Sequence, residues 1–191
     1  MGEYGYDGTS VGAVSKAAGV PKSLVFHYFG SKATLLSAVM TQGAYRFFDA
    51  MRAAQADPPS GGTHTERMGW YLRTTADVFG SHHDFHRLHT ILMMTGDSAD
   101  QGGVLDSIRE IRTEGRRHMH TMVASAFADL GPEAAEAVAA ELESFGMVGI
   151  DGSYIGERGD GRPMTEQIDR LTVAMVAIGE AAAAAYAARV S

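Results

Sequence analysis

Side chains that can contact phosphates and base edges cluster in the first 32 residues of this 191-residue chain. All three lysines of the sequence lie there, among hydroxyl groups and one imidazole. Ammonium groups neutralise phosphates, and hydroxyl and imidazole groups can donate to phosphate oxygens or base edges. On charge alone, the same lysines would equally suit an ordinary solvated surface. The combination favours a nucleic-acid contact surface made of Thr9, Ser10, Lys16, Lys22, Ser23, His27, Tyr28 and Lys32.

A second group with possible chemistry is the histidine-rich segment HHDFHRLH at residues 82–89. On a helix, His82, His86 and His89 recur at spacings of four and three, which places three imidazoles on one face. Such a stripe could hold zinc or nickel, and a metal-responsive protein is therefore an alternative. Because no cysteine and no HExxH motif accompanies the stripe, we favour partly exposed or pocket-lining histidines and expect no metal and no cofactor.

Aromatic and thioether side chains are abundant between residues 70 and 154, and the chain has 11 methionines. Flexible methionines suit an adaptable pocket for an apolar ligand, although most such side chains could simply form the core. His86, His89, Arg112 and Tyr154 are the polar groups that we expect to orient a ligand. The full predicted ligand-binding set is Trp70, Phe85, His86, His89, Met93, Arg112, Met119, Met122 and Tyr154.

The sequence offers little for catalysis. It has no cysteine, which excludes disulfides, thiolate metal sites and cysteine nucleophiles. It also contains no phosphate-binding loop and no recognisable set of nucleophile, base and orienting group. We therefore predict that the protein is not an enzyme.

The formal net charge of -7 hides an uneven distribution. Residues 1–50 contain four basic and three acidic residues, and no acidic residue lies between Asp7 and Asp49. The other 141 residues carry a net charge of -8. A cationic head on an acidic body would repel DNA except through the head, so the overall charge does not exclude a nucleic-acid partner.

Helices must position these residues, because apolar side chains recur at spacings of three and four along most of the chain. No segment alternates long enough to form a strand, so the predicted class is all-α. Long helices are expected to begin near residues 31, 64, 83, 104, 132 and 164. The segments that separate them are DPPSGG (57–62), Gly80–Ser81, TGDSADQGG (95–103), Gly131–Pro132 and ERGDGRP (157–163).

Two short helices are predicted before residue 31. Thr9 or Ser10 can cap the first, with Val11, Val14 and Ala18 on its inner side, and Gly19 can end it. Pro21 opens the second, which ends at Gly30, and Leu24 or Val25 can point inward together with Phe29. Two short helices joined by a glycine turn are typical of a helix-turn-helix, whose second helix enters the major groove of DNA.

This stretch resembles the DNA-binding head of the tetracycline-repressor (TetR) family of bacterial transcriptional regulators. The positions in register with the family pattern lie between residues 5 and 35: Gly5, Thr9, Ser10, Val14, Ala18, Gly19, Val20, Lys22, Tyr28, Phe29, Ser31, Lys32 and Leu35. The rest of the chain agrees with the family only in the number and order of helices.

The resemblance implies a helix-turn-helix DNA-binding head at residues 1–45 and an effector-binding and dimerisation domain at residues 46–191. It also implies a cytoplasmic homodimer that pairs through its last two helices and binds a palindromic double-stranded DNA operator. Such a regulator is expected to be a repressor that a small apolar or aromatic effector releases from DNA. The apolar segment at residues 171–188 fits this interpretation, because Glu180 at its centre favours a buried helix over a membrane span.

Several positions depart from the family pattern. Leu24 and Phe26 lack hydroxyl groups that family members commonly direct at the DNA backbone, so the head should bind phosphate less well or through other groups. Only four residues precede Gly5, where the family has an amphipathic helix of about four turns. We therefore expect that the sequence is a truncated product or has an incomplete start, and a small-molecule-binding protein that no longer binds DNA is an alternative function.

Overall fold

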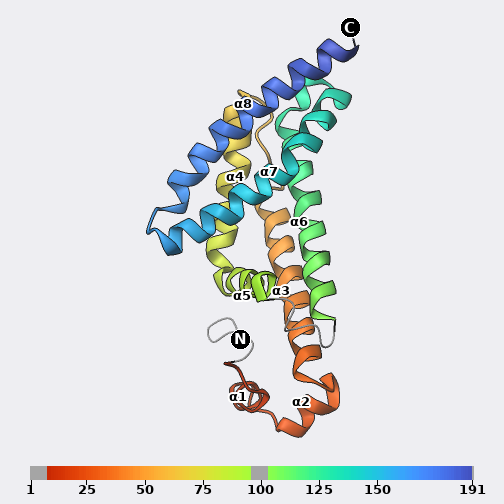
Figure 1. Cartoon of the computed structure of the whole chain (residues 1–191), viewed down its shortest axis with the longest axis vertical. Coiled ribbons are helices and arrows are strands. Elements are labelled where there is room, and N and C mark those ends of the chain that lie inside the picture. The colour runs from red at the N-terminus through yellow and green to blue at the C-terminus, as the bar shows by residue number, and fades with distance from the viewer. Residues whose placement is uncertain (1–7, 96–102, 191) are drawn as a thin grey trace. The chain divides into compact units, whose positions relative to one another are not determined.

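A computed structural model describes residues 8–95 and 103–190, and within these ranges the chain forms helices and no strand. The all-α prediction is therefore confirmed. Figure 1 shows the elements in chain order. They are α1 (Val11–Ala17), α2 (Lys22–Phe29), α3 (Lys32–Ala54), α4 (His64–Ser81), α5 (His83–Thr95), α6 (Val104–Ala126), the 3-10 turn η2 (Ala128–Leu130), α7 (Pro132–Gly159) and α8 (Met164–Val190).

Gly80 and Ser81, which were predicted to separate two helices, are the last two residues of α4. Two further predicted helix ends need correction. The helix predicted to run to Leu130 ends as α-helix at Ala126, because Phe127 leaves the helical region with φ -109° and ψ 17° and a 3-10 turn follows. The next helix continues into the predicted ERGDGRP break as far as Gly159, where Asp160 forms its C-cap. Both errors fall at helix ends, where apolar periodicity carries the least information.

The described residues group into two compact units. The first unit lies within Met1–Ala50 and Phe79–Arg112, and the second lies within Met51–Val78 and Thr113–Ser191. Helices α3, α4 and α6 each contribute to both. The predicted functional boundary between residues 45 and 46 is a separate matter and stays a prediction.

The first two helices owe their ends to local side chains and glycines. The Ser10 hydroxyl accepts a hydrogen bond from the Ala13 amide at 3.0 Å and so caps α1. Gly19 and Gly30 follow α1 and α2 with φ values of 68° and 69°. Residues other than glycine rarely adopt this left-handed region of backbone conformation, which explains why a glycine follows both helices. Ser31 caps α3 in the same way, through the Thr34 amide at 3.0 Å.

A small apolar cluster holds these helices together. Val11, Val25 and Leu35 are buried against one another, and Val14, Val20 and Phe29 pack around them. Of the two alternatives for the inner side of α2, Val25 is correct, since Leu24 is 40% exposed. Ala18 was predicted on the inner side of α1 but is exposed, and Ser15 is buried instead.

The first unit also contains an aromatic cluster that joins α3, the end of α4 and α5. The ring of His86 stacks on Phe79 at 3.7 Å between centroids and meets Phe47 edge-on at 4.4 Å. Phe85 stacks against Phe47 at 5.7 Å. Because a methyl group on Gly43 would lie 2.6 Å from the Phe85 ring, α3 and α5 approach each other closely at this point.

The core of the second unit contains side chains from α4, α6, α7 and α8, and α7 packs along α8. Glycines permit two close approaches: Gly149 faces Leu171, and Gly179 faces the fully buried Phe127. By length and composition α8 could also cross a membrane, a criterion that core helices of soluble proteins meet as well. Its buried side includes Ile168 and Met175, which are fully covered within the unit.

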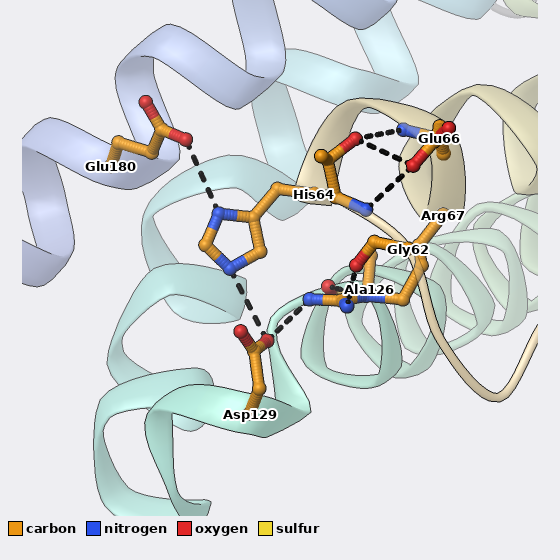
Figure 2. Close-up of polar contacts among 8 residues, drawn as sticks. Gly62, His64, Glu66, Arg67, Ala126, Asp129 and Glu180 are labelled. Atoms are coloured by element: carbon orange, nitrogen blue, oxygen red, sulfur yellow. Dashed lines mark hydrogen bonds and ion pairs between the residues drawn. The ribbon is translucent and has the colours of Figure 1, made fainter.

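Polar contacts tie the start of α4 to η2 and α8 within the second unit (Figure 2). His64 places its Nε2 atom 3.2 Å from Asp129 and its Nδ1 atom 3.2 Å from Glu180. Arg67 donates to the backbone oxygens of Ala126 and Gly62 at 2.7 and 2.6 Å and pairs with Asp129. The guanidinium thus donates to a carbonyl in the last turn of α6, where no amide of the same helix is available as a donor.

Candidate functional site

The exposed surface of α2 is the first candidate site. Val25 is buried, and Ser23 and His27 each lie two positions from it, so at about 100° per residue they project from the opposite side of the helix. Residues one position from Val25 lie on the two flanks. Lys22 and Phe26 share one flank, where the ammonium group lies 5.6 Å from the ring centroid.

The other flank of α2 carries Leu24 and Tyr28, which are 40% and 74% exposed. The Tyr28 ring meets His27 edge-on, with centroids 5.4 Å apart. The helix therefore presents a central polar ridge of a hydroxyl and an imidazole with larger side chains on both sides. This arrangement suits a helix that enters a groove about 12 Å wide.

The remaining predicted DNA contacts occupy α1, α3 and the chain before α1. Lys16 is exposed in the last turn of α1, and Lys32 is half-buried at the first position of α3. Ser10 is exposed and its hydroxyl is engaged as the cap of α1. Thr9 is buried at 7% exposure, so of the eight predicted contacts it is the one whose side chain does not reach the surface.

A cavity of about 610 Å³ lies within the first unit, between the end of α2, α3 and α5. Its walls are mainly apolar, with the Arg46, Gln42 and Asp84 side chains among them. This volume falls in the range of small-molecule sites. The apolar lining is Phe29, Leu35, Ala38, Val39, Met40, Gly43, Phe85 and Leu88, of which only Phe85 belongs to the predicted ligand set.

Five predicted ligand residues lie in the first unit, on α5 and α6. Phe85 stacks against His89 at 6.0 Å, and both His86 and His89 are buried at 6% exposure. Burial, together with the smaller effect of the positive charge of Arg112, lowers the pKa of His89 to about 4. Among the described residues, Nε2 of His89 has no hydrogen-bond partner. Met93 is half-buried on the same helix.

The other four predicted ligand residues lie in the second unit. Met119 and Met122 are core residues at 2% exposure, and the Met122 sulfur lies 3.2 Å from the Gln55 amide nitrogen. Tyr154 is buried, with the Arg158 guanidinium 4.0 Å from its ring centroid. Trp70 is half-buried beside Tyr71. The role of these four side chains as ligand contacts stays a prediction.

The histidine stripe does not form a metal-binding cluster in the described part of the chain. His82 precedes α5 and lies 3.1 Å from the Ser81 hydroxyl, while His86 and His89 are buried among aromatic rings. No group of three potential ligands occurs among the residues that the structure describes. The metal-responsive alternative therefore receives no support from this geometry.

Two polar networks in the second unit were not predicted from the sequence. One is the His64 and Arg67 cluster of Figure 2. Its sequence signal was the pair Thr63 and Glu66, which form a reciprocal capping box at the start of α4. The other is Gln55, which accepts from His118 at 2.8 Å and donates to Thr75 at 3.1 Å. No local pattern marks Gln55, because its partners come from distant helices.

The family model described as "Bacterial regulatory proteins, tetR family" matches residues 1–39. The fold is similar to the crystal structure of a TetR-family transcriptional regulator from Streptomyces coelicolor, with a TM-score of 0.66 and 20% identity over 95% of this chain and 75% of that chain. A comparison with curated proteins finds no matching sequence. The first two findings confirm the resemblance predicted from residues 5–35.

Proposed function

We propose that this chain, whose residues 1–39 match the TetR family model and whose fold is similar to that of a TetR-family regulator, is a cytoplasmic repressor that a small effector releases from a palindromic operator. Regulation of transcription through DNA binding is the general function of this family, whose members generally catalyse no reaction. The repressor role, the effector and the symmetry of the operator are our proposals for this chain.

The observation that carries the DNA-binding part is the exposed surface of α2. Its ridge of Ser23 and His27 projects away from the buried Val25, inside a segment that has no acidic residue from 8 to 48. Lys22 adds exposed positive charge to one flank of this surface, and Lys16 is exposed on α1. The net charge of -8 on residues 51–191 would keep DNA from binding elsewhere.

The test is selection of duplex DNA from a random library by the full chain, followed by gel shifts at several salt concentrations. We expect a palindromic sequence, and an affinity that falls as salt rises. Lys22→Gln should weaken binding and reduce the salt slope by about one. Arg170→Gln is the matched control, since Arg170 is exposed on α8 and pairs with Glu166. Failure to enrich any sequence would refute the proposal and leave the DNA-incompetent alternative.

The dimer part rests on apolar side chains that α7 and α8 leave exposed. Phe145, Val148 and Ile155 on α7 are 42%, 65% and 52% exposed, and Val173 on α8 is 64% exposed. Their spacings of three and seven on α7 place them along one face of the helix. A patch of this kind on a soluble protein is typical of an interface with a second copy.

Sedimentation velocity tests the dimer. Val148→Glu should convert the protein to a monomer, because a carboxylate would be buried unpaired in the interface. Val190→Glu is the matched control, since Val190 has the same 65% exposure but lies at the end of α8, away from this face. An unchanged sedimentation coefficient for both variants would contradict the proposed interface.

For the effector, we propose a small apolar or aromatic compound. Support comes from the cavity in the first unit, its apolar lining and the aromatic cluster beside it. A panel of such compounds should contain some that raise the melting temperature and also release the selected DNA. Phe85→Ala should weaken both effects, whereas Tyr45→Ala, which removes an exposed ring from the same unit, should not. Release without a melting shift would point to action on DNA instead.

A further inference from the structure

The recognition surface of α2 is unusually apolar for a surface expected to meet DNA. Leu24 is 40% exposed and Phe26 is 41% exposed, although α2 has only eight residues. Single exposed apolar residues are common on proteins and need no explanation. Here two of them flank Val25 in the sequence and lie on opposite sides of the one helix that the proposed function places in the major groove.

Their positions on the helix define where they would meet a duplex. Ser23 and His27 form the central ridge, while Leu24 and Phe26 lie about 100° to either side of Val25. A helix that inserts its ridge toward the base edges brings its flanks against the outer parts of the same groove. Leu24 and Phe26 therefore face base pairs next to those read by the ridge, on opposite sides.

Neither side chain can donate or accept a hydrogen bond, so neither can read a polar base edge or bind a phosphate. Burying phosphate oxygens or amino groups against them would cost free energy. The major groove offers one apolar group at a base edge, the C5-methyl group of thymine. The Lys22 ammonium group, 5.6 Å from the Phe26 ring centroid, adds a positive charge on that flank that can reach the adjacent phosphate.

We propose that Leu24 and Phe26 are specificity-determining residues that select thymines flanking the central bases of each half-site, through contact with the thymine methyl groups. This inference rests on the proposed DNA-binding function. It assigns Ser23 and His27 to the central bases and the two apolar flanks to methyl recognition. At these two positions, where the family pattern has hydroxyl groups, the helix would thus make apolar contacts with thymine methyl groups.

The experiment uses wild-type protein and the DNA selected from the random library. Each thymine of the selected sequence is replaced singly by uracil, which keeps every hydrogen-bonding group and removes only the methyl. We expect the affinity to fall about fourfold at the contacted positions, which is the effect of removing one buried methyl group, and to stay unchanged at the other positions. The positions that lose affinity should flank the centre of each half-site. Equal affinities for all uracil and thymine versions would overturn the proposal while leaving sequence-specific binding intact.

Two variants assign the effect to residues. Leu24→Ser should abolish the uracil penalty at one flanking position and keep it at the other, and Phe26→Ser should do the reverse. Tyr45→Ser, which removes a 70% exposed ring on α3, should leave both penalties unchanged. Both substituted residues are exposed, and circular dichroism checks the fold of each variant. Penalties that persist in both α2 variants would overturn the assignment, and a protein that selects no sequence would overturn it together with the proposed function.

Discussion

Replacing His89 by leucine should make the protein more resistant to acid. His89 lies on α5, is 6% exposed and stacks against Phe85. Its protonation is opposed mainly by burial and also by the positive charge of Arg112, which together lower its pKa from 6.5 to about 4. Leucine has a similar volume, carries no ionisable group and removes the Nε2 atom that lacks a hydrogen-bond partner among the described residues.

The expected magnitude follows from proton linkage. Below pH 6.5 the unfolded chain binds a proton at His89, whereas the folded chain does not until about pH 4. The contribution of His89 to stability is therefore complete above pH 6.5 and is lost as the pH falls from 6.5 toward 4. Between pH 7.5 and 5.0 this lowers the free energy of unfolding by about 2 kcal/mol.

Urea unfolding at pH 5.0, 6.0 and 7.5 measures this change. Burial also lowers the pKa of His118, which acts in the same direction but is present in both proteins and cancels in the comparison. The difference between His89→Leu and wild type should therefore shift by about 2 kcal/mol in favour of the variant from pH 7.5 to pH 5.0. His27→Leu, which removes an exposed imidazole from α2, is the control for a general effect. Parallel pH dependences of His89→Leu and wild type would refute the reasoning.

Two further predictions concern the second unit. Arg67→Met should lower the free energy of unfolding by about 2 to 3 kcal/mol, because it leaves the Ala126 carbonyl and Asp129 without their guanidinium partner. The control is Arg73→Met, which breaks an exposed pair with Asp169 and should lower the free energy of unfolding by less than about 1 kcal/mol. Equal losses in urea unfolding would contradict the role of the buried contacts. Gly179→Ala should lower the melting temperature, because the added methyl group would lie 2.5 Å from the ring of the fully buried Phe127. The clash costs about 1 to 3 kcal/mol, which is more than alanine gains over glycine in helix propensity. Gly80→Ala, with no atom near the added methyl, should raise the melting temperature or leave it unchanged.

The sequence determined most of the helices and the helix-turn-helix. Apolar spacings of three and four depend only on the helical repeat, and breaks such as DPPSGG act through local backbone preferences. The ends of α1 and α2 were predictable for the same reason, since Gly19 and Gly30 supply the left-handed conformation that follows each helix and Ser10 caps the start of α1. The predicted helix ends before Gly131 and before the ERGDGRP segment were wrong, because helix ends depend on the packing around them.

Which side chains are buried and which contact each other depends on how the helices pack together, which no local sequence pattern reveals. The tertiary structure placed Val25 inside and Leu24 outside, although both are apolar and adjacent, because the direction of α2 against α1 and α3 fixes which side is covered. It buried His89, assigned Met119 and Met122 to a core, and joined Arg67 to Asp129 and Gln55 to His118. These outcomes depend on residues that are more than 60 positions apart in the last two cases, and such distant pairings leave no periodic or local signal in the sequence.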